Sequence, residues 1–417
     1  MVHSVANIDF HPPLPHPLAF RGMLCCTLSV FLIAMGCSNP QDASNPTKPE
    51  PGEIATPAKR TQRQSPNSDE RVFSNSESSR YSASRFMRQP GLVPPLTDPE
   101  IFSPETVSLE EDSEVLGILI EKVARAYSIP TLYYHHVIND RIAGHSVVVT
   151  YCGFCSSGTA FMATINAKRA LFSLHGAWQA TATINDAQTQ SVWLHLTGEC
   201  IDGRLKGNQL SPINVRHVTW KSWRDAHPET TVVMLNTPAT RFTTSSKFQK
   251  GQDDLPPALA QTIEVTSSRY PANAMVYGVA LWDGKPASLG AVKAYPFEEL
   301  QNSTAVINDY VGESPVVIGF DRANRSAFGY LRILEDRVLA FSATASGKLV
   351  DHHTSSIFSQ DGICIEGVYV GKQLPAIFGL QAEWYGWYAT YPQTDVYQVA
   401  ATTPVVHQQT LDQVPHD

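Results

Sequence analysis

The sequence has few charged residues and no strongly basic region. Charged residues make up 17% of its 417 residues, and 31 Lys and Arg stand against 39 Asp and Glu, which gives a formal net charge of -8. No run of basic residues could follow a phosphate backbone, so we expect no nucleic acid as a partner. The hydrophobic fraction of 42% is sufficient for one or two ordinary domains.

Familiar catalytic signatures are also missing. The sequence contains no glycine-rich phosphate loop, no Gly-x-Ser-x-Gly elbow and no His-Glu-x-x-His pair. These are the short motifs of many nucleotide-binding proteins, serine hydrolases and zinc peptidases. No cofactor is firmly implied, although a metal ion is compatible with the residues discussed below.

The apolar run near the N-terminus is too short for a permanent membrane span. It covers residues 23–35, whereas a transmembrane helix needs about 20 residues. Arg21 precedes it and Gly36-Cys37 follows it, and this order of charge, apolar stretch and small residue is typical of a secretory signal. Residues 33–37 resemble the lipobox of bacterial lipoproteins, in which the cysteine is diacylated, although Ala34 and Met35 depart from its usual residues.

We therefore predict a signal peptide over residues 1–36 and lipid attachment at Cys37. The protein would be exported and held to a membrane by its N-terminal lipid, facing the periplasm or the cell exterior. The alternative is ordinary signal cleavage with release. Residues 37–105 are rich in Ser, Asn, Pro and Gln, a composition that cannot bury enough apolar surface to offset chain entropy, and they predict a disordered tether.

The rest of the sequence repeats itself. Residues 137–140 (Val-Ile-Asn-Asp) recur as residues 306–309, a shift of 169 (306 minus 137). Further along, the shift is 164 (364 minus 200): Cys200, Trp220 and Trp223 recur as Cys364, Trp384 and Trp387. The constant order and the rare residue types indicate an internal duplication. We place the first copy at residues 106–240, a connector at 241–265, a second, degenerate copy at 266–400 and a tail at 401–417.

Each copy is predicted to be mostly strand. Residues 116–129 alternate apolar and polar residues around Glu121-Lys122, and their counterpart, residues 276–295, turns at Asp283-Gly284, which is hairpin chemistry. Residues 147–151 form a continuous β-branched run that predicts a buried strand, and residues 161–174 and 331–343 predict further hairpins.

One short amphipathic helix is predicted to close each copy. Its aromatic or His residues follow one helical face, and we expect the tryptophans to serve core packing; these residues are Trp220, Trp223 and His227 in one copy and Trp384, Trp387 and Tyr391 in the other. The predicted fold class is α+β, predominantly antiparallel β, in two tandem copies that could be related by pseudo-symmetry.

Several motifs of the first copy resemble those of a known family. They are His135, Asn139-Asp140, residues 147–155 (Val-Val-Val-Thr-Tyr-Cys-Gly-Phe-Cys), Asp186, residues 191–193 (Ser-Val-Trp) and residues 197–199 (Thr-Gly-Glu). In this order they resemble an uncharacterised bacterial and archaeal domain-of-unknown-function family, whose members read Trp-His-Glu, Asn-Asp, Thr-Tyr-Cys-Pro-Leu-Cys or Thr-Tyr-Cys-Pro-Leu-Thr, Ser-x-Trp and Thr-Gly-Glu.

The resemblance covers residues 114–235 and reaches the second copy only through the first. Tyr134 and His136 stand where the family has Trp and Glu, and Gly153-Phe154 replaces Pro-Leu. If that Glu is functional in the family, this copy is altered. The resemblance implies membership and no mechanism, because the family has no settled activity.

Cys152 and Cys155 carry the most specific chemical signal. The second copy has Asp321 and a polar loop at this place, so the fold forms without the pair, and the pair indicates local function or bracing. Three interpretations remain open: a structural or redox-active disulfide between the two, a metal site completed by His135 or His175, and a Cys152 nucleophile with His135 as its base.

The remaining polar signals point to structure. Cys200 and Cys364 lie in equivalent apolar segments and are expected to be buried free thiols rather than bridged. Asp186 and Asp351 are expected to form turns by bonding their own backbone. The sequence thus favours a binding or structural module with a Cys-x-x-Cys-braced site for a small-molecule or protein ligand. The alternative is a thiol-redox or metal-dependent enzyme that uses Cys152, Cys155 and His135.

Overall fold

The structure is a computed structural model that describes residues 87–88, 94–235, 255, 257–281 and 290–399. The predicted signal peptide, Cys37, nearly all of the predicted tether, most of the connector, the Asp283-Gly284 turn and the tail lie outside the described residues. Among the described residues, no helix has the length and apolar character that a membrane span requires.

The described chain is α+β and rich in antiparallel strands, as predicted. The elements of the first copy are β1 (Met87–Arg88), β2 (Leu96–Thr97), β3 (Glu114–Ile120), β4 (Val123–Ser128), α1 (Ile129–His135), β5 (Val137–Ile142), β6 (His145–Cys152), β7 (Ser157–Met162), β8 (Thr164–Ile165), β9 (Lys168–Arg169), β10 (Phe172–Trp178), β11 (Thr181–Asp186), β12 (Val192–Leu194), β13 (Cys200–Asp202), β14 (Pro212–Ile213), β15 (Val215–Thr219), α2 (Trp220–Ala226) and β16 (Thr231–Val233).

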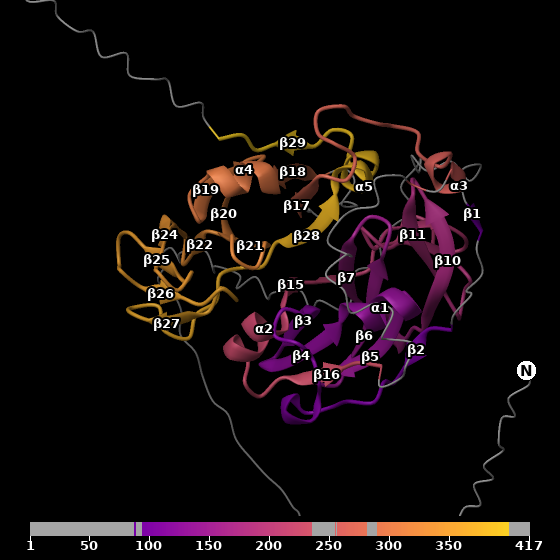
Figure 1. The fold of residues 1–417 in the computed structure, drawn as a ribbon, viewed down its shortest axis with the longest axis horizontal. Coiled ribbons are helices and arrows are strands. Elements are labelled where there is room, and N and C mark those ends of the chain that lie inside the picture. The colour runs from indigo at the N-terminus through magenta and orange to yellow at the C-terminus, as the bar shows by residue number, and fades with distance from the viewer. Residues whose placement is uncertain (1–86, 89–93, 236–254, 256, 282–289, 400–417) are drawn as a thin grey trace, which may run out of the picture. The chain divides into compact units, whose positions relative to one another are not determined.

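The second copy repeats this order (Figure 1). After α3 (Pro257–Ala260), its elements are β17 (Met275–Leu281), β18 (Ala291–Pro296), α4 (Phe297–Asn302), β19 (Val306–Val311), β20 (Ser314–Asp321), β21 (Ser326–Leu331), β22 (Ile333–Leu334), β23 (Arg337–Val338), β24 (Phe341–Ala343), β25 (Leu349–Asp351), β26 (Ile357–Phe358), β27 (Cys364–Glu366), β28 (Phe378–Glu383), α5 (Trp384–Thr390) and β29 (Asp395–Val396).

Each main sheet of the first copy has a counterpart in the second, although in the described chain β1, β2 and β14 add strands only in the first copy. The sheet β15-β3-β4-β16 matches β28-β17-β18-β29, and in both the last strand joins in parallel. Strands β5-β6-β7 match β19-β20-β21, and β10-β11-β12-β13 match β24-β25-β26-β27. The predicted duplication of a β-rich domain is therefore confirmed in the order of elements and in the strand pairing.

Local sequence explains the β3–β4 hairpin and the buried strand β6. Glu121 and Lys122 both have positive φ, 48° and 71°, as a two-residue hairpin turn requires, and β3 pairs with β4 around them. The β-branched run of β6 is buried from Val147 to Cys152. Both predicted features are confirmed.

The closing helices α2 and α5 pack their tryptophans into the core, as expected. Trp223 and Trp387 are 2% and 0% exposed. Each indole lies over a glycine of the neighbouring strand, where an added Cβ on Gly117 or Gly278 would be 2.3 Å from the ring. Small residues at these two strand positions allow the helix to approach its sheet.

One part of the sequence prediction needs correction. The predicted tether extends through residue 105, yet β2 pairs with β5 and Asp98 forms an ion pair with Arg169, so the folded region begins before that boundary. The predicted closing helix is present in each copy, and two helices beyond that prediction, α1 and α4, also form. They have seven and six residues, too short for a helical pattern to stand out beside the strands.

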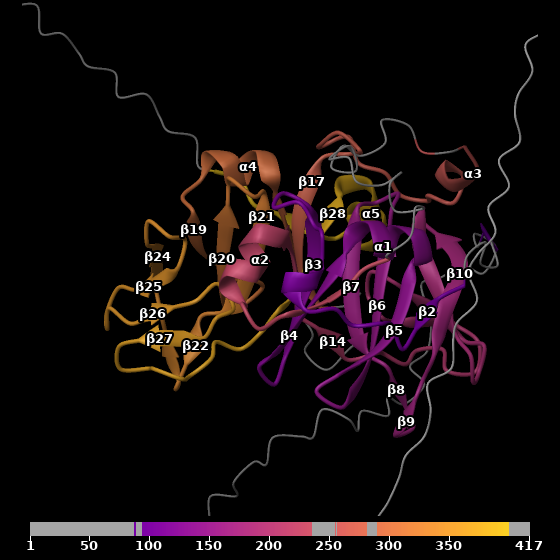
Figure 2. The ribbon, with the colours of Figure 1, turned by 60° about the horizontal axis from the view of Figure 1, so that its bottom comes forward.

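The two copies contact each other through equivalent elements. Strand β28 of the second copy packs on β7, and β15 of the first copy packs on β21; β28 and α5 can be seen beside β7 in Figure 2. The Glu383 N–H donates to the Cys155 carbonyl at 2.9 Å, and the Thr219 hydroxyl donates to Asn324 at 3.2 Å. Glu383 and Thr219 each precede a closing helix, so the junction has the pairwise character of a two-fold interface.

Candidate functional site

The Cys-x-x-Cys segment forms the turn between β6 and β7. Cys152 is the last residue of β6, and Cys155 lies two residues before β7 begins. In the second copy, the same turn is held by Asp321, whose carboxylate accepts hydrogen bonds from the Ala323 and Asn324 N–H groups. A turn of this kind therefore forms without sulfur, and the cysteines have to be explained in another way.

A histidine that the sequence reasoning missed completes the site. The ligating atoms of Cys152, Cys155 and His195 all lie within 4.8 Å of one another, and all three residues are buried. His195 directly follows β12 (Val192–Leu194), which brings its ring from a neighbouring sheet to the turn. Two sulfurs and an imidazole nitrogen form a donor set that zinc and other soft or borderline metals prefer.

Hydroxyl groups hold the imidazole in place. The Nδ1 atom of His195 is 2.9 Å from the Thr150 hydroxyl, and its Nε2 atom is 2.7 Å from the Ser157 hydroxyl. Ser157 in turn is 2.9 Å from the Cys155 sulfur. This chain of contacts fixes the ring orientation, as the outer partners of metal-bound histidines do.

The protonation states of the three residues differ. Burial lowers the pKa of His195 to about 3, so the ring is neutral and can offer a lone pair. The hydrogen bond from Cys155 lowers the pKa of Cys152 to about 7 against the opposing effect of burial. Burial raises the pKa of Cys155 well above its usual value. Cys152 is therefore the thiolate-forming member of the pair.

The second copy supplies the cover of this site. Its Glu383 is 1% exposed, accepts a 2.9 Å hydrogen bond from the Ser156 hydroxyl, and has a pKa raised by burial to about 8. Tyr385 packs with both cysteines in one apolar cluster. An added Cβ on Gly386 would be 3.0 Å from the Cys155 Cβ, so the two copies are in close contact here.

The predicted histidine partners do not join the cysteines, which is a correction. The Nδ1 atom of His135 lies 2.8 Å from the Pro94 carbonyl, at the end of α1, and His175 is half-buried on β10. Neither belongs to the group of ligating atoms around Cys152 and Cys155. The sequence places His135 near the cysteines because of its motif, but α1 carries it to the segment preceding β2.

All four described cysteines, Cys152, Cys155, Cys200 and Cys364, are free and buried. For Cys200 and Cys364 this is the expected state, and each thiol donates to a carbonyl two residues ahead, at 3.3 Å and 3.2 Å. A disulfide between Cys152 and Cys155 stays a prediction for the oxidised protein.

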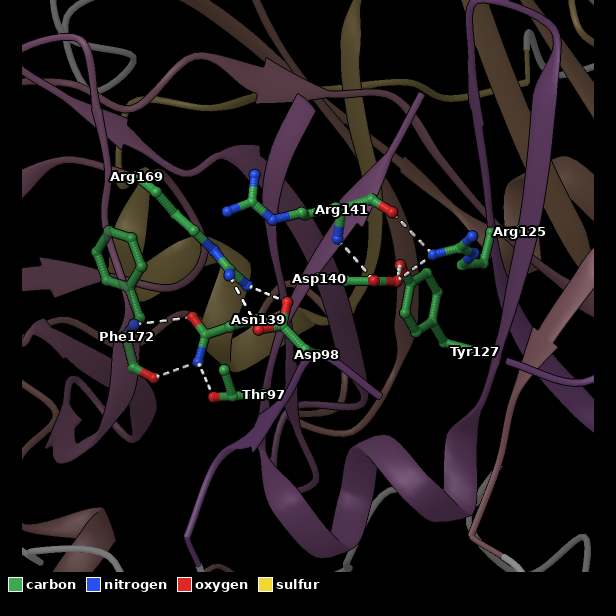
Figure 3. A network of polar contacts seen from close by, with 9 residues as sticks. All are labelled: Thr97, Asp98, Arg125, Tyr127, Asn139, Asp140, Arg141, Arg169 and Phe172. Atoms are coloured by element: carbon green, nitrogen blue, oxygen red, sulfur yellow. Dashed lines mark hydrogen bonds and ion pairs between the residues drawn. The ribbon is translucent and has the colours of Figure 1, made fainter. Parts of the chain in front are cut away.

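The Asn-Asp motif belongs to the fold rather than to a site (Figure 3). The Asn139 side chain bonds both the N–H and the carbonyl of Phe172, at 2.8 Å and 2.9 Å, and Asn308 bonds Phe341 in the same way. Asp140 is buried against Arg125 and the Tyr127 hydroxyl, at 2.7 Å and 2.6 Å.

The second copy keeps this arrangement, with Lys293 in the place of Arg125. Asp309 pairs with Lys293 at 2.7 Å and accepts from the Tyr295 hydroxyl at 3.0 Å. The turn-forming role expected of Asp186 and Asp351 is likewise confirmed, since each accepts from the N–H three residues ahead. Motifs that both copies share are thus structural devices.

The alignment of the two copies in the structure shows how His195 differs from its counterpart, whereas the sequence shift of 164 alone pairs it with Ser359. Leu194 and Ser359 make the same kind of backbone bond, to the carbonyls of Glu199 and Ile363, so the residue after each is equivalent, and His195 corresponds to Gln360. The first copy alone has His at this place, as it alone has Cys152 and Cys155. The histidine lies between the Ser-x-Trp and Thr-Gly-Glu motifs but is part of neither.

Comparisons with known proteins give a family and no activity. No curated protein and no solved structure matches this chain. A family model described as "Protein of unknown function (DUF3179)" matches residues 90–394, which span both copies and most of the 417 residues. The chain belongs to this family of unknown function, and the prediction of an uncharacterised family is confirmed at that level.

Proposed function

We propose that this protein is an exported, lipid-anchored metal-binding module that holds one zinc-like divalent ion on Cys152, Cys155 and His195. The observation that carries the proposal is the convergence of three buried ligating atoms within 4.8 Å in the copy that alone has these residues. We favour binding over catalysis because the three ligands are covered by the other copy.

The size of the cluster suits such an ion. Zinc–sulfur and zinc–nitrogen bonds of about 2.3 Å and 2.0–2.1 Å place tetrahedral ligands about 3.6–3.8 Å apart. The present spread of 4.8 Å at most therefore has to contract by about 1 Å. The Ser157 hydroxyl, which contacts both Cys155 and His195, is an oxygen that the fourth position could use.

Charge also favours a divalent ion. Two thiolates carry a charge of -2, so an ion of charge +2 leaves the buried site neutral, whereas a monovalent ion leaves a net charge that is costly to bury. His195 contributes no charge because burial keeps its pKa at about 3. Loading releases the thiol protons, as binding of metal to cysteine requires.

The second candidate is a thiol-redox pair, which one observation favours. The pKa of Cys152 is lowered to about 7 while that of Cys155 is raised, an asymmetry suited to a nucleophilic thiolate with a resolving partner. Closing the disulfide would transfer two electrons and two protons to a disulfide oxidant. The exposed fractions of Cys152 and Cys155, 2% and 0%, leave no approach for a protein disulfide.

Metal analysis of the mature chain, purified without chelator, tests the proposal. We expect one zinc-like ion per chain at this site, lost in Cys152→Ser/Cys155→Ser and in His195→Gln, the latter carrying the residue of the second copy. Cys200→Ala, which removes a buried thiol elsewhere, should retain the ion. A folded, metal-free protein that refuses added Zn²⁺ at these residues would overturn the proposal.

Two further measurements test the redox candidate and the lipid anchor. For the metal-free protein, a Cys152–Cys155 reduction potential above about -300 mV would support the redox candidate, and a lower one would indicate an inert structural bond. Anchoring is tested by Cys37→Ser, which should release the protein from membranes. An unchanged membrane fraction would reject the lipid attachment.

A further inference from the structure

A small cavity lies between the two copies, next to the cysteine turn, which contributes Ser156 to its lining. Its volume is about 30 Å³, and each copy contributes half of the lining residues. About 10–15 Å³ of such volume holds one water molecule, so the space accommodates two waters or a small hydrated ion and excludes most organic ligands.

The lining residues include three pairs of equivalent positions that have diverged. Glu114 and Met275 pair across the sheet with the equivalent residues Thr219 and Glu383. Ser156 and Arg325 each precede the equivalent strands β7 and β21, and His217 and Gln381 are related by the shift of 164. Positions that serve the fold, such as the Asn-Asp motif, kept their chemistry, whereas these did not.

His217 is the unexplained residue in this cavity. Its side chain is 9% exposed, and neither ring nitrogen has a hydrogen-bond partner among the described residues. The Tyr151 ring packs edge-on against it at 6.3 Å and holds it in place. Leaving a buried imidazole without hydrogen bonds costs free energy, which a ligand would recover.

The distance between His217 and Glu114 identifies the kind of ligand. Nε2 of His217 and Oε2 of Glu114 are 3.6 Å apart, which is too long for a direct hydrogen bond of about 2.7–3.2 Å. If a water or ammonium group were hydrogen-bonded to both atoms at about 2.8 Å, the angle at its central atom between the two partners would be only about 80°. One tetrahedral zinc-like ion places such ligand atoms about 3.4 Å apart.

We propose that this junction cavity is a second metal site, in which a divalent transition-metal ion binds between His217 and Glu114 and keeps water at its other positions. The Glu114 carboxylate, 22% exposed, supplies the negative charge. Arg325 also lines the cavity, but it is an exposed residue, so solvent screens its charge. Its two ligands, on β3 and β15 of the first copy, are distinct from those of the cysteine cluster, and residues of the second copy complete the lining of the cavity.

The duplication supplies matched variants. His217→Gln and Glu114→Met each install the residue that the second copy already has at the equivalent position, so both should fold. His145→Gln is the control, because it removes a histidine of β6 that does not line the cavity and that pairs with the exposed Glu121 at 3.0 Å. Circular dichroism checks the fold of each variant.

The experiment counts ions bound to the metal-stripped mature chain in equilibrium dialysis against Zn²⁺. We expect two ions per chain for the natural protein and for His145→Gln, and one for His217→Gln and for Glu114→Met. Cys152→Ser/Cys155→Ser should also bind one, and its combination with His217→Gln none. With Co²⁺, the ion lost in the cysteine variant shows thiolate-to-metal charge transfer, and the ion lost in His217→Gln does not.

The outcomes separate the two sites. If His217→Gln and Glu114→Met bind as many ions as the natural protein, the junction site is rejected, whatever the cysteine variant does. If only the cysteine variant is unchanged, the junction site stands and the cysteine site falls.

Discussion

Single residues in this protein fall into two groups when equivalent positions are compared. Asn139 and Asn308 make the same two bonds to a neighbouring strand, so the duplication preserved what the fold needs. Cys152 and His195 have no like residue in the second copy, where Asp321 and Gln360 stand instead. Equivalent positions that keep the same residue therefore indicate a role in stability, and equivalent positions that differ indicate the candidate sites.

Burial predicts that Asn139→Ala weakens the fold more than Asn308→Ala. Asn139 is buried, so its loss leaves a buried N–H and carbonyl without their partner, which costs about 2–3 kcal/mol, whereas Asn308 is exposed and water can replace its bonds. Urea unfolding should show the larger loss for Asn139→Ala. Metal content should stay that of the natural protein in both variants, and a loss of metal in Asn139→Ala alone would instead give that residue a role in the site.

At the scale of elements, the sequence predicts strands and turns well but not the convergence of distant segments. Alternation located the β3–β4 hairpin and the β-branched run of β6, because these signals are local. His195 was missed because it comes to Cys152 and Cys155 through the stacking of two sheets, which no local pattern reports. His135 was chosen for its nearness in the sequence, and α1 moves it elsewhere.

The hairpin turns offer a test at this scale. Lys122 and Asp336 have φ of 71° and 62° at the second turn position of equivalent hairpin types, a conformation that glycine adopts with less strain. Lys122→Gly and Asp336→Gly are expected to raise the free energy of unfolding by about 0.5–1 kcal/mol. Thermal unfolding measures the change, and a lower melting temperature for both would contradict the turn geometry.

At the scale of the whole molecule, the two copies depend on each other. The cysteine site is covered by Glu383 and Tyr385 of the second copy, and the core cluster around Trp193 of the first copy includes Trp384 and Trp387 of the second. Duplication followed by divergence thus produced two copies with different roles. The first copy carries the paired thiols, and the second copy covers them.

An ionic cluster between the two copies makes the stability of the protein depend on pH. Arg216 donates to the carbonyl and side-chain oxygens of Gln360, both at 2.9 Å, and lies 3.6 Å from Asp361. His227 is 3.4 Å from the other oxygen of Asp361. Burial acts to raise the pKa of Asp361, but His227 and Arg216 outweigh it and hold that pKa below its usual value.

The direction of the shift fixes the pH window. Because the pKa of Asp361 is lower in the folded protein than in the unfolded chain, its contribution is complete above the unfolded value of about 3.9 and disappears as the pH falls through the folded value. Asp361→Asn should therefore lower the free energy of unfolding by about 3 kcal/mol at neutral pH, since Arg216 is left buried and unpaired. The difference from the natural protein should shrink below about pH 4.

Urea unfolding of both proteins between pH 3 and 7 measures this effect. Asp225→Asn is the control, because Asp225 pairs with Lys221 on the exposed face of α2, where both side chains are about half exposed and an ion pair contributes little. A loss that persists unchanged below pH 4 would mean that Asp361 acts through packing rather than charge. The copies would then be joined mainly by the apolar contact of β7 with β28.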